Sequence, residues 1–268
     1  MPDPHFITYR HSRINYHRFG SGPSHVCCFH GYGEDGSRFQ LFEKELGEAY
    51  TLIAIDLPFH GQTEWKEGLL LKPEELLGII QLILPKETKI TLMGYSMGGR
   101  VCLQLIASFP TFFNKLVLIA PDGLHKNPWQ RFSTQTLIGN RIFGFTMQHP
   151  GWLFALMDLA GRLGLFNKSI IRFVHHYLDH EEERKILYQR WTTMRMFRPS
   201  LKHLKKIIHK HAIPLHLIFG KYDRVIVPIH GYRFQEGMES FISVTELTAG
   251  HHLLQDKYKQ ELIVAGQF

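Results

Sequence analysis

Two kinds of hydrophobic pattern divide the chain into strands and helices. Residues 6–9 and 14–19 alternate apolar with polar side chains, and the glycines and proline of residues 20–23 follow them, which is typical of edge strands in a hairpin-like start. Continuous apolar runs come next, and such runs suit strands that are buried on both faces. They lie at residues 26–29, 52–55, 90–93, 116–119 and 215–219.

Between these runs, apolar residues recur at helical spacing. The helical pattern covers residues 39–46, 73–84 and 100–109, and Pro73 stands where a helix favours proline. Strand alternating with helix predicts a mostly parallel central sheet flanked by helices. An alternating segment at 241–247 and a helical stretch at 253–264 close the chain.

The regular alternation stops at Pro121 and resumes near Pro214. The intervening stretch of about ninety residues is rich in Trp, Phe, Met and His, and a structureless loop of that length is uncommon in a compact domain. We therefore expect an α/β core at residues 1–121 and 212–268 with a helical cap inserted at residues 122–211. The aromatic side chains of the cap suit either an apolar acyl pocket or an ordinary helical core.

Composition narrows the class of protein. With 44% hydrophobic and 21% charged residues, the chain can bury a sizeable core. It contains no run of about 18 apolar residues and no apolar signal segment, which predicts no membrane span and a cytoplasmic location. The cysteines at 27 and 28 lie in an apolar run and suit core packing, and the adjacent histidine pairs lack metal-ligand spacing.

The formal net charge of +7 raises the question of a nucleic-acid partner. Much of the basic excess lies at residues 202–211, where Leu204, Ile207 and Ile208 supply the apolar side of a helix. A solvated basic helix face needs no partner, so we expect no nucleic acid to bind.

The strongest chemical motif is a G-x-S-x-G at residues 94–98, centred on Ser96. It follows the predicted strand 90–93 directly and opens the predicted helix 100–109. A serine on a tight strand-to-helix turn needs a strained backbone, and the flanking glycines remove Cβ atoms that would collide there. This placement predicts that Ser96 is a nucleophile.

A serine nucleophile needs a base and a carboxylate that orients the base. His251 follows Gly250 in a loop after the segment 241–247, and its neighbour His252 is the alternative base. Asp223 lies just beyond the strand 215–219, whereas Asp122 competes because it follows the strand 116–119. The end of a strand is the usual place for such side chains in a parallel sheet.

Acyl transfer also requires donors for a developing oxyanion. The turn His30-Gly31-Tyr32-Gly33 comes immediately after the strand 26–29. We predict that the backbone N–H groups of Tyr32 and Met97 form an oxyanion hole, which requires both loops to converge at one end of the sheet. His30 suits a structural hydrogen bond that supports the loop better than a second base.

Taken together, these residues resemble the α/β-hydrolase superfamily, specifically its branch of capped serine hydrolases that includes esterases, carbon–carbon bond hydrolases and haloperoxidase-like enzymes. The landmarks follow one another in family order as HGYG at 30–33, DLPFHGQT at 56–63, GYSMGG at 94–99, GKYD at 220–223 and GH at 250–251. The resemblance implies a triad of Ser96, Asp223 and His251. Phe59 departs from it, because a glycine is common at that position in the family.

The resemblance implies cleavage of a small or medium carboxylic ester through an acyl-enzyme on Ser96, with no metal or organic cofactor. An aspartate at the nucleophile position would have indicated an epoxide hydrolase or a dehalogenase. Two alternatives stay open at this point. One is a carbon–carbon bond hydrolase of a diketone-like substrate, and the other is a ligand-binding regulator with the same fold and triad.

Overall fold

The computed structural model describes residues 5–84, 89–125, 128–162 and 178–268. The chain divides into two compact units. The core unit comprises Met1–Glu67, Leu71–His125 and Met196–Phe268, and the insert unit comprises Gly68–Leu70 and Lys126–Arg195. Helix α9 (Leu201–His211) belongs to the core unit in this division, and the cap boundaries of 122 and 211 stay a prediction.

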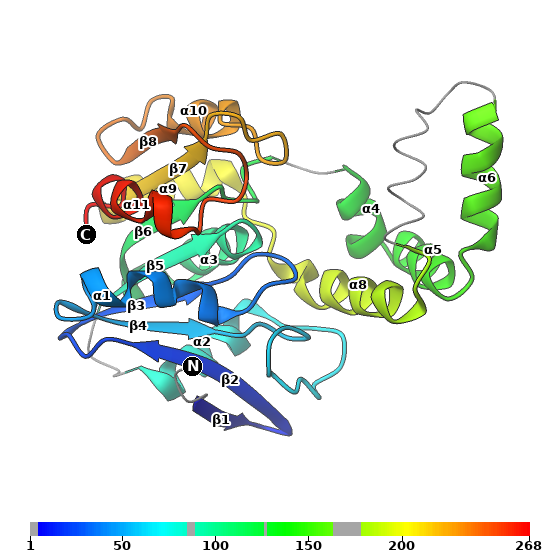
Figure 1. The fold of residues 1–268 in the computed structure, drawn as a ribbon, viewed down its shortest axis with the longest axis horizontal. Helices are drawn as coiled ribbons and strands as arrows, with labels where there is room; N and C mark the ends of the chain where they lie inside the picture. The colour runs from blue at the N-terminus through cyan, green and yellow to red at the C-terminus, as the bar shows by residue number, and fades with distance from the viewer. Residues whose placement is uncertain (1–4, 85–88, 126–127, 163–177) are drawn as a thin grey trace. The chain divides into compact units, whose positions relative to one another are not determined.

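Among these residues, an eight-stranded sheet runs through the core unit in the order β1-β2-β4-β3-β5-β6-β7-β8 (Figure 1). Neighbouring strands pair antiparallel at β1–β2 and β2–β4, and parallel from β4 through β8. This arrangement confirms the mostly parallel sheet with a hairpin at its edge. The strands are β1 (His5–Tyr9), β2 (Ser12–Phe19), β3 (Ser24–Phe29), β4 (Tyr50–Ile55), β5 (Ile90–Tyr95), β6 (Phe113–Ile119), β7 (Leu215–Gly220) and β8 (Ile242–Leu247).

Burial along the strands follows their apolar runs. Every residue of β5 and β7 is buried, and β3 and β4 are buried after their first one or two residues. Strand β1 has no buried residue, as expected for the edge of the sheet. A parallel strand covered on both faces needs apolar side chains in both directions, which explains the continuous runs.

Helices cover both faces of this sheet, with α1 and α11 in front and α2, α3 and α9 behind in the view of Figure 1. Phe39, Phe42 and Leu262 from the front layer pack in one core cluster with Met93 and Ile119 of the strands. The core helices are η1 (Gly36–Phe42), α1 (Glu43–Leu46), α2 (Pro73–Ile83), α3 (Met97–Ser108), η2 (Pro110–Phe112), α10 (Ile229–Gln235), η4 (Asp256–Tyr258) and α11 (Lys259–Ala265).

Two predicted helices differ from the structure. The segment 39–46 is a 3-10 helix as far as Phe42 and then a single turn of α-helix, and Asp35 caps the start of the 3-10 helix by accepting a hydrogen bond from Ser37 N–H. The stretch 253–264 becomes helical only at Asp256, with a 3-10 turn before α11. Leu253 and Leu254 are buried but lie outside regular secondary structure, so their apolar character mimicked a helix face.

The insert unit is helical, as predicted. Its described helices are α4 (Pro128–Gln135), α5 (Leu137–Gln148), α6 (Gly151–Arg162) and α8 (Glu181–Thr193), followed by η3 (Met194–Met196). Buried Arg184 of α8 donates from Nε to the carbonyl of Met147 at 2.8 Å, and Asn140 of α5 donates to Thr192 Oγ1 at 3.1 Å. These bonds tie α5 to α8. No helix within the described ranges combines the length and the apolar content that crossing a bilayer requires.

Candidate active site

Ser96 occupies the sharp turn between β5 and α3. Its backbone has φ 49° and ψ −113°, in the left-handed half of conformational space that side chains with a Cβ disfavour. Three hydrogen bonds hold this conformation: Ser96 N–H donates to the carbonyl of Ile119 at 2.9 Å, and the Ser96 carbonyl accepts from Gly99 N–H and Asp122 N–H, each at 2.9 Å. The surrounding backbone therefore over-determines the turn, as strained functional residues require.

Close backbone contacts explain the glycines of the motif. A Cβ on Gly98 would lie 1.9 Å from the carbonyl oxygen of Phe29, and a Cβ on Gly94 would lie 2.6 Å from the carbonyl oxygen of Gly98. Both separations are shorter than any van der Waals contact, so a side chain at either position displaces the turn. These two contacts explain why the G-x-S-x-G pattern needs a glycine at both flanking positions.

The structure brings Ser96, His251 and Asp223 together in one hydrogen-bonded chain. His251 Nε2 lies 3.1 Å from Ser96 Oγ, and His251 Nδ1 lies 2.7 Å from Asp223 Oδ2. Ser96 follows β5, Asp223 follows β7 and His251 follows β8, so three loops at the carboxyl ends of parallel strands supply the group. These distances are within the hydrogen-bond reach that a serine nucleophile, its base and an orienting carboxylate would need.

Asp223 is held as a buried carboxylate. Its Oδ1 accepts hydrogen bonds from Val225 N–H at 2.7 Å and Ile226 N–H at 2.9 Å, which leaves Oδ2 for His251. Burial raises the pKa of Asp223, but the hydrogen bonds from His251, Ile226 and Val225 outweigh it and place the pKa below its ordinary value. The carboxylate stays ionised and fixes the proton of His251 on Nδ1.

Neither His252 nor Asp122, the two alternatives, takes part in the hydrogen-bonded group of Ser96, His251 and Asp223. His252 is exposed and stands edge-on to His251, with the ring centroids 5.9 Å apart. The Asp122 carboxylate accepts from Gly123 N–H at 2.6 Å and pairs with Arg100 Nε at 3.5 Å. Asp122 contributes to the site through its backbone, since its N–H holds the Ser96 carbonyl.

Tyr95, the variable residue before Ser96 in the G-x-S-x-G motif, supports the loop that carries His251. Its hydroxyl donates to the carbonyl of His251 at 3.1 Å, and the two rings lie 5.7 Å apart. Burial, followed by the nearby Glu34 and Asp223 carboxylates, raises the pKa of Tyr95, so the hydroxyl remains a donor. Tyr95, the residue before Ser96, therefore helps to position the loop that carries His251, and the sequence holds no signal for this pairing.

The turn at residues 31–34 lies beside the nucleophile turn. Strands β3 and β5 are neighbours with Phe29 opposite Gly94, so the loops that follow them leave the same end of the sheet. Glu34 N–H donates to the carbonyl of Gly31 at 3.3 Å, and a Cβ on Gly31 would lie 3.0 Å from the ring of Tyr95. Convergence of the two loops, which an oxyanion hole from Tyr32 and Met97 requires, is present.

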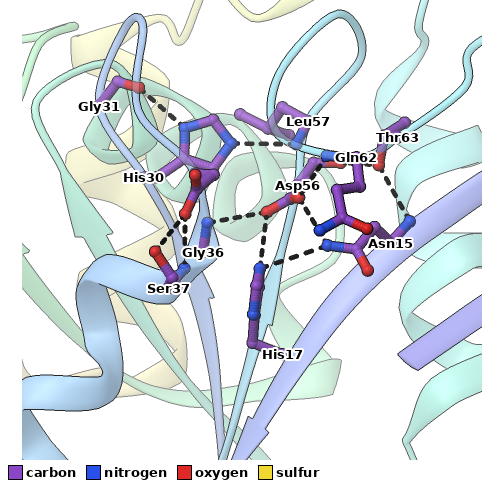
Figure 2. A network of polar contacts seen from close by, with 11 residues as sticks. Asn15, His17, His30, Gly31, Gly36, Ser37, Asp56, Leu57, Gln62 and Thr63 are labelled. Carbon is purple, nitrogen blue, oxygen red and sulfur yellow. Dashed lines mark hydrogen bonds and ion pairs between the residues drawn. The ribbon is translucent and has the colours of Figure 1, made fainter. Parts of the chain in front are cut away.

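His30 fixes the direction of the peptide that ends in the Tyr32 N–H. Leu57 N–H donates to His30 Nε2 at 3.0 Å, so the ring proton lies on Nδ1, which donates to the Gly31 carbonyl at 2.8 Å (Figure 2). In a trans peptide, the C=O of Gly31 and the N–H of Tyr32 point in opposite directions. A fully buried, neutral His30 thus orients the predicted oxyanion donor, which is the supporting role expected for it.

Asp56 organises a second buried network behind this turn (Figure 2). Its carboxylate accepts from Gly36 N–H at 2.8 Å, Gln62 N–H at 3.0 Å and Asn15 Nδ2 at 2.7 Å, and it lies 3.4 Å from His17 Nε2. Burial raises the pKa of Asp56, but the hydrogen bonds from His17, Gly36, Asn15 and Gln62 outweigh it and lower the pKa to about 2. The network holds the loop whose Leu57 N–H reaches His30.

Phe59, the departure from the family pattern, lies in this loop with φ 63°. Glycine tolerates a positive φ without strain, whereas a bulky residue there is uncommon. The position of Phe59 in this chain is therefore one at which glycine would be accommodated with less strain.

His17, Asp35 and Asp56 offer ligand atoms within 4.8 Å of one another, a spacing that a cation would accept. Each carboxylate already accepts protein donors, since Asp35 caps η1 through Ser37 and Asp56 binds the N–H groups of Gly36 and Gln62. This donor set suits a hydrogen-bond network, and we assign it no metal.

Relatives with similar sequences include hydrolases and esterases. The chain is 24% identical over 254 residues to an uncharacterized hydrolase, YugF, of Bacillus subtilis (strain 168), with 90% of this chain and 88% of the relative covered. It is 30% identical over 128 residues to the pimeloyl-[acyl-carrier protein] methyl ester esterase of Aeromonas salmonicida (strain A449). That match spans 47% of this chain and about half, 49%, of the esterase.

Solved structures show the same fold. The thioesterase domain from the curacin biosynthetic pathway superposes with a TM-score of 0.65 at 18% identity, covering 99% of both chains. A meta-cleavage product hydrolase from Pseudomonas fluorescens IP01 gives a TM-score of 0.61 at 17% identity, covering 96% of this chain and 93% of that one. The model of the alpha/beta hydrolase fold family matches residues 24–258. The chain belongs to the alpha/beta hydrolase fold family.

Proposed function

We propose that this protein is a serine hydrolase that cleaves a small or medium carboxylic ester through an acyl-enzyme on Ser96. The observation that carries the proposal is the hydrogen-bonded chain from Ser96 Oγ through the His251 ring to the Asp223 carboxylate. A serine hydroxyl is a weak nucleophile at neutral pH, and a base within hydrogen-bond reach removes this obstacle.

In the first half of the reaction, His251 Nε2 accepts the Ser96 hydroxyl proton while Oγ attacks the ester carbonyl carbon. The resulting oxyanion accepts hydrogen bonds from the N–H groups of Tyr32 and Met97. Met97 is the first residue of α3, so its N–H is among those that a helix leaves without an internal acceptor. Collapse of the intermediate breaks the bond to the alkoxy group, which leaves with the proton from His251.

In the second half, His251 takes a proton from water, and the resulting hydroxide attacks the acyl-enzyme carbonyl. The acid is released when Oγ departs and recovers the proton from His251. Asp223 keeps the imidazole in the required tautomer and stabilises the imidazolium that forms twice per cycle. The reaction as written needs no metal or organic cofactor.

Support for an ester substrate comes from the hydrogen-bonded chain of Ser96, His251 and Asp223. It also comes from the similarity to the methyl ester esterase of Aeromonas salmonicida (strain A449). The two alternatives predict different results with the same protein. A carbon–carbon bond hydrolase turns over a diketone-like substrate in preference to esters. A ligand-binding regulator shows a reactive Ser96 without sustained turnover.

The test is a panel of aryl acetate, butyrate and octanoate esters together with a diketone. Wild type, Ser96→Ala and the matched control Ser108→Ala, an exposed serine at the other end of α3, are compared. We expect ester turnover by wild type and Ser108→Ala and none above background by Ser96→Ala. If wild type hydrolyses no ester faster than Ser96→Ala does, the esterase proposal fails, and diketone turnover or fluorophosphonate labelling alone identifies which alternative holds.

A further inference from the structure

The base of the core unit, at the amino ends of the central strands, carries two adjoining hollows that the proposed reaction does not use. One has a volume of about 410 Å³ and the other about 330 Å³, and Lys89 and Asn114 line both. We call the pair the base groove. Its polar side chains include Ser24, His25, Lys89, Thr91, Asn114 and Lys115.

The charged side chains among the described residues of the base groove are of one sign. The described residues that line it include Lys89, Lys115 and His211, and none of them is Asp or Glu. Clefts lined by one sign of charge concentrate ligands of the opposite sign.

Lys115 is half-buried without a carboxylate partner among the described residues. Its Nζ donates to the carbonyl of Gln267 at 2.8 Å and lies 4.2 Å from the centroid of the Phe268 ring. An ammonium has three N–H donors, so this carbonyl uses only part of its capacity. Burial lowers the pKa of Lys115. Burial also lowers the pKa of His216, and the positive charge of Lys115 lowers it further.

Other polar side chains line the same hollow as Lys115. The Nδ1 atom of His25 is buried without a hydrogen-bond partner in the part of the chain that the structure describes. Thr91 Oγ1 donates to Asn114 Oδ1 at 3.2 Å, which leaves the amide group of Asn114 as its remaining donor. Lys89 is exposed at the rim. Ammonium, amide and hydroxyl groups thus line the base groove, and groups of this kind suit the oxygens of a phosphate.

We propose that the base groove binds the phosphate group of a small phosphorylated molecule. The site is separate from Ser96, because the six residues of β5 that lie between the two ends of the sheet span roughly 20 Å. Volumes of a few hundred Å³ accommodate a small-molecule ligand. The proposal does not depend on the ester hydrolase activity, since a protein without esterase activity would bind phosphate in the same way.

Amide NMR titration of the full-length chain tests the proposal, with inorganic phosphate as the probe and acetate as the carboxylate probe at constant ionic strength. We expect saturable shifts confined to the residues of the base groove and smaller ones with acetate. Lys89→Gln should weaken phosphate binding by about tenfold or more, as loss of a charge-assisted contact does. Lys257→Gln, which removes an equal charge from an exposed site elsewhere, should leave binding unchanged.

Lys115 provides the second variant. Lys115→Gln should weaken binding as Lys89→Gln does, whereas Lys115→Arg should retain most of it because the charge remains. Thermal melting of each variant separates loss of binding from loss of folding, and ester turnover by Lys89→Gln should equal that of wild type. Equal phosphate affinity in wild type, Lys89→Gln and Lys115→Gln, shifts scattered over the surface, or acetate binding as tight as phosphate binding would each overturn the proposal.

Discussion

The core unit around Ser96 and the insert unit differ in how tightly their side chains are held. In the core, backbone contacts fix the position of each functional group: Ser96 is held at a positive φ by three hydrogen bonds, and Asp223 is buried with both oxygens satisfied. In the insert, large apolar side chains are exposed. They include Trp129 at 78%, Leu137 at 84%, Ile138 at 69% and Phe145 at 57% of their full accessibility.

The contrast teaches where each property of the protein is encoded. Chemistry that depends on sub-ångström placement is built on strands and their tight turns, where a single Cβ matters. The insert exposes apolar side chains on its helices, and many different side chains would satisfy the same helices. We therefore expect substitutions at the turns of the core unit to have larger effects than substitutions on the exposed side of the insert helices.

The largest expected effect is on catalysis within the core. Asp223→Asn leaves a side chain of the same shape but favours the wrong tautomer of His251, so kcat should fall by about 10⁴-fold. Steady-state ester hydrolysis measures this change. The control is Asp256→Asn, which removes an exposed carboxylate and should leave kcat unaltered. A loss below tenfold for Asp223→Asn would show that the contact with His251 is not used.

A pair of glycines compares the two units directly. Gly98→Ala forces a Cβ to within 1.9 Å of the Phe29 carbonyl, whereas a Cβ on Gly151, at the start of α6, meets nothing within 4 Å. We expect Gly98→Ala to lower the free energy of unfolding by about 3 kcal/mol or more and Gly151→Ala to change it by less than about 0.5 kcal/mol. Urea denaturation measures both. Equal effects would remove the distinction between the units.

His30 sharpens the comparison within the core, because it acts through another group. His30→Gln cannot accept from Leu57 and hold the Gly31 carbonyl in the same geometry, so the Tyr32 N–H should lose its orientation. Loss of one oxyanion donor costs about 10²-fold in kcat, with KM little changed. His252→Gln is the matched control and should retain full kcat. A rise in KM at constant kcat would assign His30 a role in substrate binding instead.

The buried Asp56 network should make the core sensitive to acid. The folded-state pKa of about 2 lies below the ordinary aspartate value of 3.8, so Asp56 contributes stability that is present above pH 4 and is lost as the pH falls through 2. The shift corresponds to about 2 kcal/mol. Wild type should lose this amount of unfolding free energy between pH 5 and 2 relative to Asp56→Asn. Parallel pH profiles of the two proteins would contradict the assignment.

The smallest effect is expected on the exposed side of the insert. Leu137→Ala should change the free energy of unfolding by less than about 0.5 kcal/mol, because the side chain buries little surface. Leu118→Ala, at a fully buried position of strand β6, should cost about 3 kcal/mol. Chemical denaturation of both variants tests the pair. A large loss for Leu137→Ala would show that this side chain packs against something in solution.

The fold followed from the sequence wherever local pattern and tertiary environment agree. The apolar runs at 90–93 and 215–219 predicted strands because a strand covered on both faces admits little else. Residues 39–46 and 253–264 were harder, because apolar side chains at helical spacing also pack in a 3-10 helix or outside regular secondary structure. Leu253 and Leu254 are buried in this way.

The residues of the site divide along the same line. The proximity of Ser96, Asp223 and His251 could be predicted because each follows a strand at the same end of the sheet, and topology brings such loops together. The bond from the Tyr95 hydroxyl to the His251 carbonyl joins residues 156 positions apart, and no spacing rule predicts it. The central role of Asp56 became visible only through the distances to its four partners.

The central claim is that Ser96 carries the acyl group, and trapping that intermediate tests it most directly. Wild type is mixed with an aryl acetate, quenched in acid within the first turnover, digested and examined by mass spectrometry. The account predicts a burst of phenol and one acetyl group on the peptide that contains Ser96, absent from Ser96→Ala. Hydrolysis without an acyl adduct, or an adduct on another side chain, would contradict it.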